Sequence, residues 1–252
     1  MEAVGSNKTV VVTGACSGIG QGIAVAFGLQ GFSVVINFPS DNTEHLARET
    51  QNTIEECNGK AMIVKADVTV EAEVEAMVAE ALGSYGQLDV LVNNAGIAKA
   101  SLVEDTPLDQ WQRIIDVHLK GTFLCTRAVL PHMYTRNEGR IINTASQLAY
   151  KGAAAFSHYA AAKGAIISFT RSLALEIGER RVRVNCVAPG ATMTPMLDDV
   201  PIDVLEEIRS QIPTGKLATI DNIVGSYLFL ASEEASHYQG QCLSPNGGDV
   251  FL

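Results

Sequence analysis

The amino-acid sequence predicts a single-domain α/β fold in which one parallel sheet carries helices on both faces, a doubly wound arrangement. Three observations support this fold class. Short runs rich in β-branched residues alternate with helix-length segments along most of the 252 residues. The first run is followed by a glycine-rich turn, a helix and a second run within about 30 residues, as in a right-handed βαβ unit. The residues of the motifs described below fall at or just after the ends of the runs, where such sheets bind ligands. These residues are Gly14, Asp67, Asn93, Ser146 and Pro189.

The expected strands are continuous apolar runs, which is typical of strands buried on both faces. The first is KTVVVT, and Gly31 ends the helix that separates it from the second. Seven strands are expected, at Lys8–Thr13, Phe32–Phe38, Ala61–Val68, Leu88–Asn94, Gly139–Ser146, Val182–Ala188 and Gly240–Pro245.

Helices are expected between the strands because these segments are rich in good helix formers and nearly free of proline. After the helix that ends at about Gln30, they cover Thr43–Glu56, Val70–Tyr85, Leu108–Arg136 and Ser157–Glu176. The segment Leu108–Arg136 should be bent, because Gly121 lies inside it and Pro131 lies near its end. No linker or repeat divides the chain, so residues 1–252 are expected to form one domain.

Charge and composition argue against several classes of protein. The net charge is −10 and no run of Lys and Arg occurs, so binding to nucleic acid or to an anionic membrane is not expected. No uncharged apolar run approaches the ~20 residues of a membrane span, and the N-terminal MEAVGSNKT lacks an export signal. The five cysteines are scattered without metal-ligand spacing. Reduced thiols, no metal site and a cytoplasmic location are therefore expected.

The glycine-rich turn TGACSGIG, Thr13–Gly20, has the spacing G-x-x-x-G-x-G between an expected strand and an expected helix. Glycines let the backbone approach a pyrophosphate closely, and a helix N-terminus offers free N–H groups and a positive dipole. A tight turn without a ligand is the alternative. The strand–turn–helix context favours phosphate binding.

Ser146, Tyr159 and Lys163 form the candidate catalytic group. Tyr159 and Lys163 are four positions apart on an expected helix and therefore share a face. An ammonium beside a phenol favours the phenolate, so Lys163 is expected to lower the pKa of Tyr159 and make it a general acid or base. Taken alone, such a pair is more often an ordinary pair on a solvated face. Ser146 has no activating His–Asp pair and is expected to donate a hydrogen bond to a substrate oxygen.

Two further motifs follow strand ends. Asn93-Asn94-Ala95-Gly96 combines side-chain amides, which brace neighbouring backbone, with a glycine that permits close approach of a ligand, although a plain turn fits equally well. Pro189-Gly190 leads into a segment with three prolines, acidic residues and mixed apolar residues. This segment, 193–213, is expected to form a substrate lid, the alternative being a long surface connection.

These motifs together resemble the short-chain dehydrogenase/reductase superfamily in identity, order and spacing over essentially the whole chain. The resemblance rests on TGxxxGIG, NNAG, Ser146, YxxxK at Tyr159–Lys163 and PG at Pro189–Gly190, with NGG at Asn246–Gly248 near the end. It implies a Rossmann fold with the strand order 3-2-1-4-5-6-7. The blocks DVTVEAEVEAM, YGQLDVLVNNAGI, LASEEAS and IPTGKL are most similar to bacterial glucose 1-dehydrogenases and 3-oxoacyl carrier-protein reductases.

The resemblance also implies roles for single residues. Tyr159 would be the general acid or base, Lys163 would tune it and hold the nicotinamide ribose, and Ser146 would hold the substrate oxygen. Asp67 and Val68 would contact adenine, and Asn93 would lie near the adenine ribose. The residues expected to contact the cofactor are Gly14, Ser17, Gly18, Ile19, Gly20, Phe38, Ser40, Asp67, Val68, Asn94, Ala95, Gly96, Tyr159, Lys163, Pro189, Gly190, Thr192 and Thr194.

The chain departs from the family pattern at His118, in the sequence HLKGTF, where relatives carry an Asn that orders a relay water. A histidine also binds water, and its charge changes near pH 6.5. We hypothesise that His118 serves the relay and makes turnover sensitive to pH. The alternative is a tolerated substitution in which another group holds the water.

Cofactor choice depends on the end of the second strand, Asn37-Phe38-Pro39-Ser40. The acid that would bind the ribose 2′-hydroxyl of NAD is missing there. Basic residues for the 2′-phosphate of NADP are missing too, although Ser40 and Asn42 offer hydrogen bonds. Asp41 argues against a phosphate. The sequence favours NADP or dual use over NAD alone.

The sequence therefore predicts an NAD(P)-dependent oxidoreductase that interconverts a secondary alcohol and a ketone or aldehyde. The resemblance implies a sugar, polyol, small carbonyl compound or 3-oxoacyl thioester as substrate, and a homotetramer or homodimer. A dinucleotide-binding scaffold without turnover is a second interpretation, kept open by His118. A nucleotide-sugar epimerase or dehydratase is a third, but 252 residues leave no room for its longer substrate domain.

Overall fold

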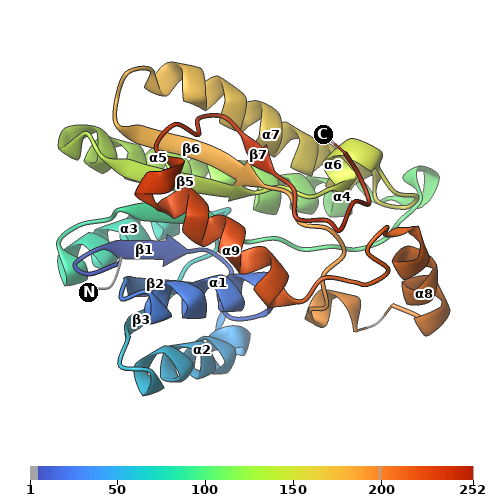
Figure 1. Cartoon of the computed structure of the whole chain (residues 1–252), viewed down its shortest axis with the longest axis horizontal. Helices are drawn as coiled ribbons and strands as arrows, with labels where there is room; N and C mark the ends of the chain where they lie inside the picture. Colours follow the sequence, from blue (N-terminus) through green and yellow to red (C-terminus); the bar gives the residue numbers. More distant parts are fainter. Residues whose placement is uncertain (1–4, 199, 252) are drawn as a thin grey trace.

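One parallel sheet organises the structure, a computed structural model that describes residues 5–198 and 200–251. Its strand order is β3-β2-β1-β4-β5-β6-β7, as predicted (Figure 1). The strands are β1 Thr9–Val12, β2 Ser33–Phe38, β3 Lys60–Lys65, β4 Val90–Asn93, β5 Gly139–Thr144, β6 Val182–Val187 and β7 Cys242–Leu243. The first four residues and the last residue of the predicted domain, and Asp199 of the predicted lid, lie outside the described residues.

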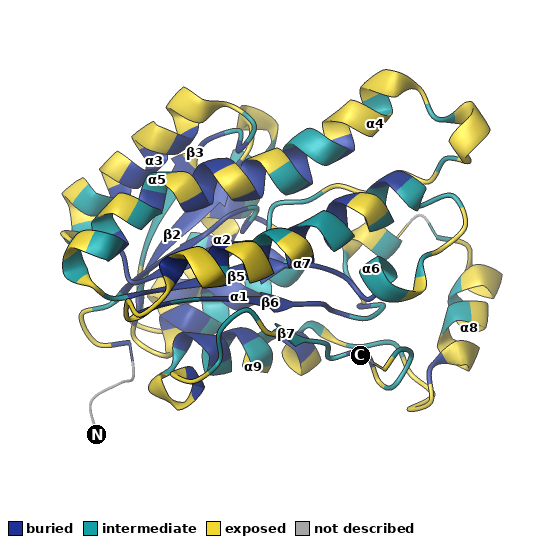
Figure 2. Ribbon diagram, turned by 90° about the horizontal axis from the view of Figure 1, so that it is seen from above, coloured by how far each residue is buried: buried dark blue, intermediate teal, exposed yellow. Residues whose placement is uncertain are grey.

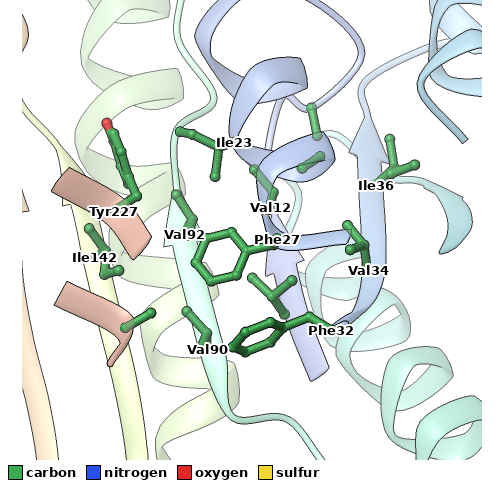
Figure 3. Packing of buried hydrophobic residues seen from close by; sticks show 14 of the residues in the cluster. Val12, Ile23, Phe27, Phe32, Val34, Ile36, Val90, Val92, Ile142 and Tyr227 are labelled. Atoms are coloured by element: carbon green, nitrogen blue, oxygen red, sulfur yellow. The ribbon is translucent and has the colours of Figure 1, made fainter. Parts of the chain in front are cut away.

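The inner strands β1, β2, β4, β5 and β6 are buried on both faces, as their continuous apolar runs predict, whereas the edge strands β3 and β7 are partly exposed. In β1, Val10 and Val12 belong to the core on one face of the sheet, and Val11 belongs to the core on the other. Side chains alternate in this way because the strand repeat is two residues. Figure 3 shows Val12, Val34 and Val92 of adjacent strands packed around Phe27 of α1.

Helices cover both faces of the sheet. The first core includes residues of α1 Gly18–Leu29, α2 Glu44–Glu56 and α9 Ile220–Ala231. The second includes residues of α3 Glu71–Tyr85, α5 Gly121–Arg136 and α7 Ser157–Ile177. In Figure 2 the buried residues form a stripe along α5 and α7, and the exposed residues lie on the opposite side of each helix. This amphipathic pattern explains why the helices dock on the sheet.

The long helix predicted for Leu108–Arg136 has the expected ends but is interrupted. It consists of α4 Leu108–Ile115, a π-helical turn over Asp116–Lys120, and α5, which begins at Gly121. The irregularity therefore lies just before Gly121, and Pro131 is accommodated within α5. π-helical turns are rare in proteins, and those that occur often lie at functional sites.

Two helices and one strand length were not predicted. The short helix α6 Leu148–Lys151 and α9 both lie where no helix was expected, and β7 is shorter than Gly240–Pro245. β7 is an edge strand that pairs only with β6, at Cys186–Cys242 and Val187–Leu243. The predicted lid contains a 3₁₀ turn at Pro195–Leu197 and α8 Ile202–Gln211.

All strand pairings are parallel, so the carboxyl ends of the strands meet at one edge of the sheet. Each predicted motif begins within two residues of a strand end at this edge: Gly14 after β1, Asp67 after β3, Asn93 in β4, Ser146 after β5 and Pro189 after β6. The fold therefore brings the motifs of distant sequence segments to one place. No helix in residues 5–198 and 200–251 is both long and apolar enough to cross a bilayer.

Candidate active site

The glycine turn after β1 has a geometry that side chains would disturb. Gly14 has a φ of +61°, in the left-handed region that favours glycine. A Cβ on Gly20 would lie 2.2 Å from the Gly14 carbonyl oxygen and 2.4 Å from Nδ2 of Asn94. Both positions therefore require glycine, which keeps the turn tight against the start of α1.

Three polar side chains hold this turn in place. The Asn37 Oδ1 accepts a hydrogen bond from the Gly14 N–H (3.2 Å), and its Nδ2 donates to the Ala66 carbonyl (2.9 Å), so it links the ends of β1, β2 and β3. The Thr13 hydroxyl accepts from the N–H groups of Asn94 (2.9 Å) and Ala95 (3.0 Å). Asn94 in return donates from Nδ2 to the Thr13 carbonyl (3.1 Å). Asn94 thus braces the turn, as the amide side chains of this motif were expected to do.

The turn and the start of α1 fit a pyrophosphate. Ser17 precedes α1 in an extended conformation, and its side chain makes no capping hydrogen bond. The first N–H groups of a helix have no partner within the helix, and they carry its positive dipole. A dinucleotide phosphate placed here would meet the backbone of Ser17, Gly18, Ile19 and Gly20, with no side-chain cap competing for the same N–H groups.

The residues expected around the adenosine lie at the ends of β2 and β3. The Phe38 side chain is buried in the core, so only the backbone of this residue is available to a ligand at the strand end. Asp67 accepts hydrogen bonds from Thr69 (2.8 Å) and Arg113 (3.2 Å). Burial raises the pKa of the Asp67 carboxyl, but these hydrogen bonds outweigh it and hold the pKa below its ordinary value. Ser40 precedes a 3₁₀ turn that begins at Asp41, and Asp41 pairs with Lys65 (2.9 Å).

The segments after β4 and β6 close over the glycine turn. A Cβ on Gly14 would lie 2.8 Å from Cα of Ala95, which places the NNAG motif directly beside the turn. A Cβ on Gly18 would lie 3.5 Å from Thr194, so the start of the predicted lid contacts the same turn. Thr192 is buried, and its hydroxyl donates to the Gly190 carbonyl (2.9 Å). The structure therefore brings most of the predicted cofactor residues together at the carboxyl edge of the sheet.

Lys163 lies on α7, one helical turn after Tyr159, and its side chain is buried. Its Nζ donates to the carbonyl of Thr144 at the end of β5 (2.6 Å) and lies 5.6 Å from the centroid of the Tyr159 ring. Burial lowers the pKa of this amine from 10.5 to about 7. The amine is therefore poised between its charged and neutral forms at neutral pH.

The pKa of Tyr159 differs from the value expected from the sequence. Burial raises the pKa of its hydroxyl, and a hydrogen bond with Ser146 offsets only part of that rise. In the protein alone, Lys163 does not bring the pKa of the phenol below its ordinary value. The reason is that loss of hydration acts against the charged forms of both groups, and Lys163 is itself only partly charged at neutral pH.

Ser146 is buried at the carboxyl end of β5, and its Oγ accepts a hydrogen bond from the Leu148 N–H (3.2 Å) at the start of α6. This bond, together with its interaction with Tyr159, fixes the hydroxyl beside the phenol. Two hydroxyls side by side at this edge suit an alcohol or carbonyl oxygen, which accepts from both.

His118 lies in the π-helical turn and is buried against the NNAG motif. Its Nε2 lies 2.7 Å from the Ile97 carbonyl oxygen, its ring packs edge-on against Tyr159 at 5.2 Å between centroids, and a Cβ on Gly96 would lie 2.6 Å from its Cε1. Burial and the neighbouring Lys163 lower the pKa of His118 to about 3. The imidazole is therefore neutral near pH 7, and the expected change of its charge near pH 6.5 does not occur in this environment.

We predict that His118→Asn leaves the shape of the pH–rate profile unchanged between about pH 5 and pH 9. A neutral imidazole has no charge to lose in this range, and an Asn amide can replace its hydrogen bond to Ile97. The profile of kcat/KM for both proteins measures this. A limb near pH 6 to 7 in the parent protein that disappears in the variant would contradict the assignment of a neutral His118.

Several residues that shape the site were given no role of their own from the sequence. Thr13, Asn37 and Asn143 are polar residues inside apolar runs, and Asn143 accepts a hydrogen bond from Asn93 Nδ2 (2.8 Å) between β4 and β5. A polar residue within a strand buried on both faces is itself a signal, because it requires a partner. Gln147 and Asp249 are joined by a hydrogen bond of 2.6 Å across more than a hundred residues, a contact that no local pattern indicates.

Comparisons with known proteins agree with this geometry. The family model described as Enoyl-(Acyl carrier protein) reductase, adh_short_C2, matches residues 14–249. The chain is 39% identical over 242 residues to the hydroxy(phenyl)methylsuccinyl-CoA dehydrogenase subunit BbsD of Thauera aromatica, covering 96% of each chain. It is 39% identical over 244 residues to 3beta-hydroxysteroid dehydrogenase 1 of Eggerthella lenta, covering 96% of this chain and 93% of that one.

A solved structure shows the same likeness in three dimensions. The crystal structure of a candidate short-chain alcohol dehydrogenase from Sinorhizobium meliloti 1021 superimposes with a TM-score of 0.92 at 32% identity, covering 97% of this chain and 96% of that one. With the glycine turn, the Ser–Tyr–Lys group and the strand order described above, the chain belongs to the short-chain dehydrogenase/reductase superfamily and is an NAD(P)-dependent oxidoreductase.

Proposed function

We propose that this protein interconverts a secondary alcohol and a ketone or aldehyde, with Tyr159 as the general acid or base. The observation that carries the proposal is the grouping of Ser146, Tyr159 and Lys163 at the carboxyl edge of the sheet, next to the glycine turn. The nicotinamide of the cofactor supplies or accepts the hydride. The protein then has to orient the substrate oxygen and to move one proton.

The chain's own residues fit that proton transfer. Ser146 and Tyr159 would each donate a hydrogen bond to a carbonyl oxygen, and Tyr159 would give up its proton as the alcohol forms. A phenolate on Tyr159 and an ammonium on Lys163 stabilise each other, so the proton of Lys163 follows the charge of Tyr159. His118 holds the Ile97 backbone beside this group, and we keep it as a candidate for ordering a relay water.

We propose NADP(H), or use of both cofactors. The second strand ends at Phe38 without a carboxylate for the ribose hydroxyl, and Asp41, which would repel a 2′-phosphate, is paired with Lys65. The ammonium of Lys65 offsets part of the negative charge of Asp41. Because both side chains are largely exposed, the pair adds little to the stability of the fold. Ser40 and the backbone that follows it offer donors to a phosphate.

The test is a panel of secondary alcohols, polyols, sugars and ketones, followed at the nicotinamide absorbance with each cofactor in turn. We expect turnover with secondary alcohols or the matching ketones, and a kcat/KM with NADP equal to or above that with NAD. Binding of a nicotinamide cofactor without turnover across the panel would favour a scaffold. A large preference for NAD would contradict the proposed cofactor.

Acyl thioesters are the second candidate class of substrate. The relative from Thauera aromatica is named for a CoA thioester, and a 3-oxoacyl chain presents a ketone of the same kind. The net charge of −10 disfavours docking of an acidic carrier protein. Of the two thioester forms, a CoA thioester is therefore the better one to include in the panel.

The segment 193–213 is proposed as the substrate lid, because it starts against the glycine turn and carries α8, whose residues are half-buried or exposed.

A homotetramer or homodimer is proposed as the assembly. Phe123 on α5 and Leu175 on α7 are apolar and exposed, 42% and 84% respectively, so these two long helices offer apolar surface for contacts between subunits. Light scattering after size-exclusion chromatography measures the assembly, and a monomer would contradict it.

A further inference from the structure

Two cysteines lie side by side on the last two strands of the sheet. Cys186 of β6 and Cys242 of β7 are paired directly in the register of these parallel strands, which are neighbours in Figure 1. Directly paired side chains point to the same face of a sheet, and both thiols belong to one small apolar cluster. Cys186 is buried and Cys242 is partly exposed, and both are free thiols. A reagent that reaches this edge of the sheet therefore meets Cys242 first, with Cys186 behind it.

The spacing of the two strands permits a disulfide between these cysteines. Adjacent strands lie about 4.8 Å apart, and the Cα atoms of a disulfide are about 4.4 to 6.8 Å apart. β7 is a two-residue edge strand that pairs only with β6, so it can make the small shift that the bond needs. Because directly paired side chains run alongside each other, the bond would be strained, and strained disulfides are readily reduced. A link between these strands is therefore expected to be reversible.

The surroundings give the two thiols different reactivities. A hydrogen bond with Cys186 lowers the pKa of the Cys242 thiol below its ordinary value, against the effect of burial. The Tyr150 hydroxyl and the charge of Arg171 lower this pKa further. The interaction with Cys242 and burial raise the pKa of the Cys186 thiol. Cys242 thus combines partial exposure with a stabilised thiolate, the two properties of a cysteine that reacts with peroxides.

The hydroxyl of Tyr150 is a second sign that a negative sulfur is accommodated here. This oxygen is buried and has no hydrogen-bond partner of good geometry among residues 5–198 and 200–251. Tyr150 packs in the same cluster as both cysteines. A thiolate on Cys242 would accept its proton, whereas a neutral thiol is a weak acceptor. The thiolate therefore satisfies a donor that the resting protein leaves unpaired.

The other three cysteines lack these features. Burial raises the pKa of the Cys125 thiol to about 12 and also raises the pKa of Cys16. Cys57 is exposed and follows the end of α2. All three lie outside the strands, so none has a cysteine partner in the sheet. The pair on β6 and β7 is therefore a site of its own and not a sample of average thiols.

We propose that Cys242 and Cys186 form a peroxide-reactive site in which Cys242 is the attacking thiol and Cys186 the resolving thiol. The Cys242 thiolate attacks one oxygen of a hydroperoxide, the O–O bond breaks, and the sulfur becomes a sulfenic acid. The other oxygen leaves and takes up a proton, as water or an alcohol. The Cys186 sulfur then attacks the sulfenic sulfur, an S–S bond forms, the S–O bond breaks, and hydroxide leaves with the Cys186 proton as water. Two thiols lose two electrons, and the peroxide gains them.

The disulfide protects the protein from irreversible oxidation. A sulfenic acid that meets more peroxide becomes a sulfinic and then a sulfonic acid, whereas a disulfide can be reduced again by a dithiol. Disulfides that form transiently in reducing compartments commonly have such a redox role. Neither cysteine belongs to the Ser–Tyr–Lys group, so the site goes beyond the proposed carbonyl–alcohol interconversion and does not depend on it.

Peptide mapping of the purified protein after treatment with hydrogen peroxide tests the site. The peroxide is raised stepwise until the exposed Cys57 is oxidised. We expect a disulfide-linked pair of tryptic peptides, one with Cys186 and one with Cys242, to appear before that point. Two thiols should be lost with it, and dithiothreitol should restore both. Oxidation of Cys57 without any link between Cys186 and Cys242 would overturn the proposal.

Three single variants assign the roles. Cys242→Ser should form no link and keep Cys186 as a free thiol. In Cys186→Ser the sulfenic acid on Cys242 should persist, so that dimedone labels Cys242 at least about tenfold more than in the parent. At higher peroxide this variant should become irreversibly oxidised at Cys242. Cys57→Ser, which removes an exposed thiol outside the sheet, is the matched control and should form the same link as the parent.

The remaining outcomes decide between specific and adventitious oxidation. Dimedone on Cys186 in Cys242→Ser, as fast as on Cys242 in Cys186→Ser, would overturn the assignment of the attacking thiol. Links that join Cys57 to either cysteine in place of the expected pair would show random oxidation and overturn the site. Thermal unfolding checks each variant, and the parent with Cys57→Ser decides the link even if Cys186→Ser does not fold. All readouts are states of thiols, so their failure leaves the proposed function untouched, and a lack of turnover leaves them valid.

Discussion

Tyr159→Phe should lower kcat by about 10²- to 10⁴-fold, the range that a positioned general acid or base contributes. The change removes one oxygen atom from a half-buried ring that packs against His118 and Phe156, and the ring contacts remain. We therefore expect the fold and the cofactor Kd to change little. Initial rates with the best substrate of the panel, together with cofactor binding measured by fluorescence, provide the measurement.

Tyr134→Phe on α5 is the matched control for this change. It removes the same atom from a tyrosine whose ring lies under Arg180, in the last turn of α5 before the amino end of β5 and outside the catalytic group. Its kcat should equal that of the parent within about twofold. Full activity of Tyr159→Phe with an intact fold would remove the basis of the proposed mechanism.

Lys163→Met should lower kcat/KM at least about a hundredfold, as expected for the loss of a preorganised donor and charge. The amine can no longer support a phenolate on Tyr159 or hold its place against the Thr144 carbonyl. The fold should survive, because the variant exchanges a buried amine for an apolar side chain of similar length, which removes one buried polar group. Kinetics and thermal unfolding of the purified variant measure both effects.

The same variant should change how stability depends on pH. The pKa of Lys163 falls from 10.5 in the unfolded chain to about 7 in the fold, so between these values the unfolded chain holds a proton that the folded protein has released. Stability contributed by this group therefore rises with pH from about 7 toward 10, by up to about 1.4 kcal/mol per pH unit. Below pH 7 both states are protonated and the contribution stays at its minimum.

Denaturant unfolding of both proteins at pH 7 and pH 9 isolates this contribution, since other groups titrate equally in each. The free energy of unfolding of the variant minus that of the parent should be larger at pH 7 than at pH 9, so the variant gains most stability relative to the parent at pH 7. An identical difference at the two values would show that Lys163 keeps its ordinary pKa in the fold.

The fold was predictable because the buried strands carry an unmistakable composition. Runs such as TVVV in β1 and VLVN in β4 are typical of buried parallel strands in an α/β chain. The glycine turn marks the end of β1 and the start of the helix that follows. The helix α9 was missed because its start has a weak signal. Thr219 forms a capping box with Asn222, whereas the usual pattern places Glu or Gln at that position.

The site was predictable where chemistry depends on spacing along the chain. Tyr159 and Lys163 lie on one helix, so their proximity follows from four residues of separation. The pKa values did not follow, because they depend on how deeply both groups are buried, which only the tertiary structure determines. The same holds for His118, whose neutral state results from its burial against Ile97 and Gly96. The cytoplasmic location and the role of the segment 193–213 as a substrate lid stay predictions.

The two open edges of the sheet bear on aggregation. Each edge strand presents unpaired backbone groups on which another chain can add a strand. β3 has an exposed, hydrated lysine at each end, Lys60 and Lys65, and such side chains disfavour the addition of a further strand. β7 has only two residues, Cys242–Leu243. Neither edge is a long, flat template, so the sheet is protected against uncontrolled growth beyond its seventh strand.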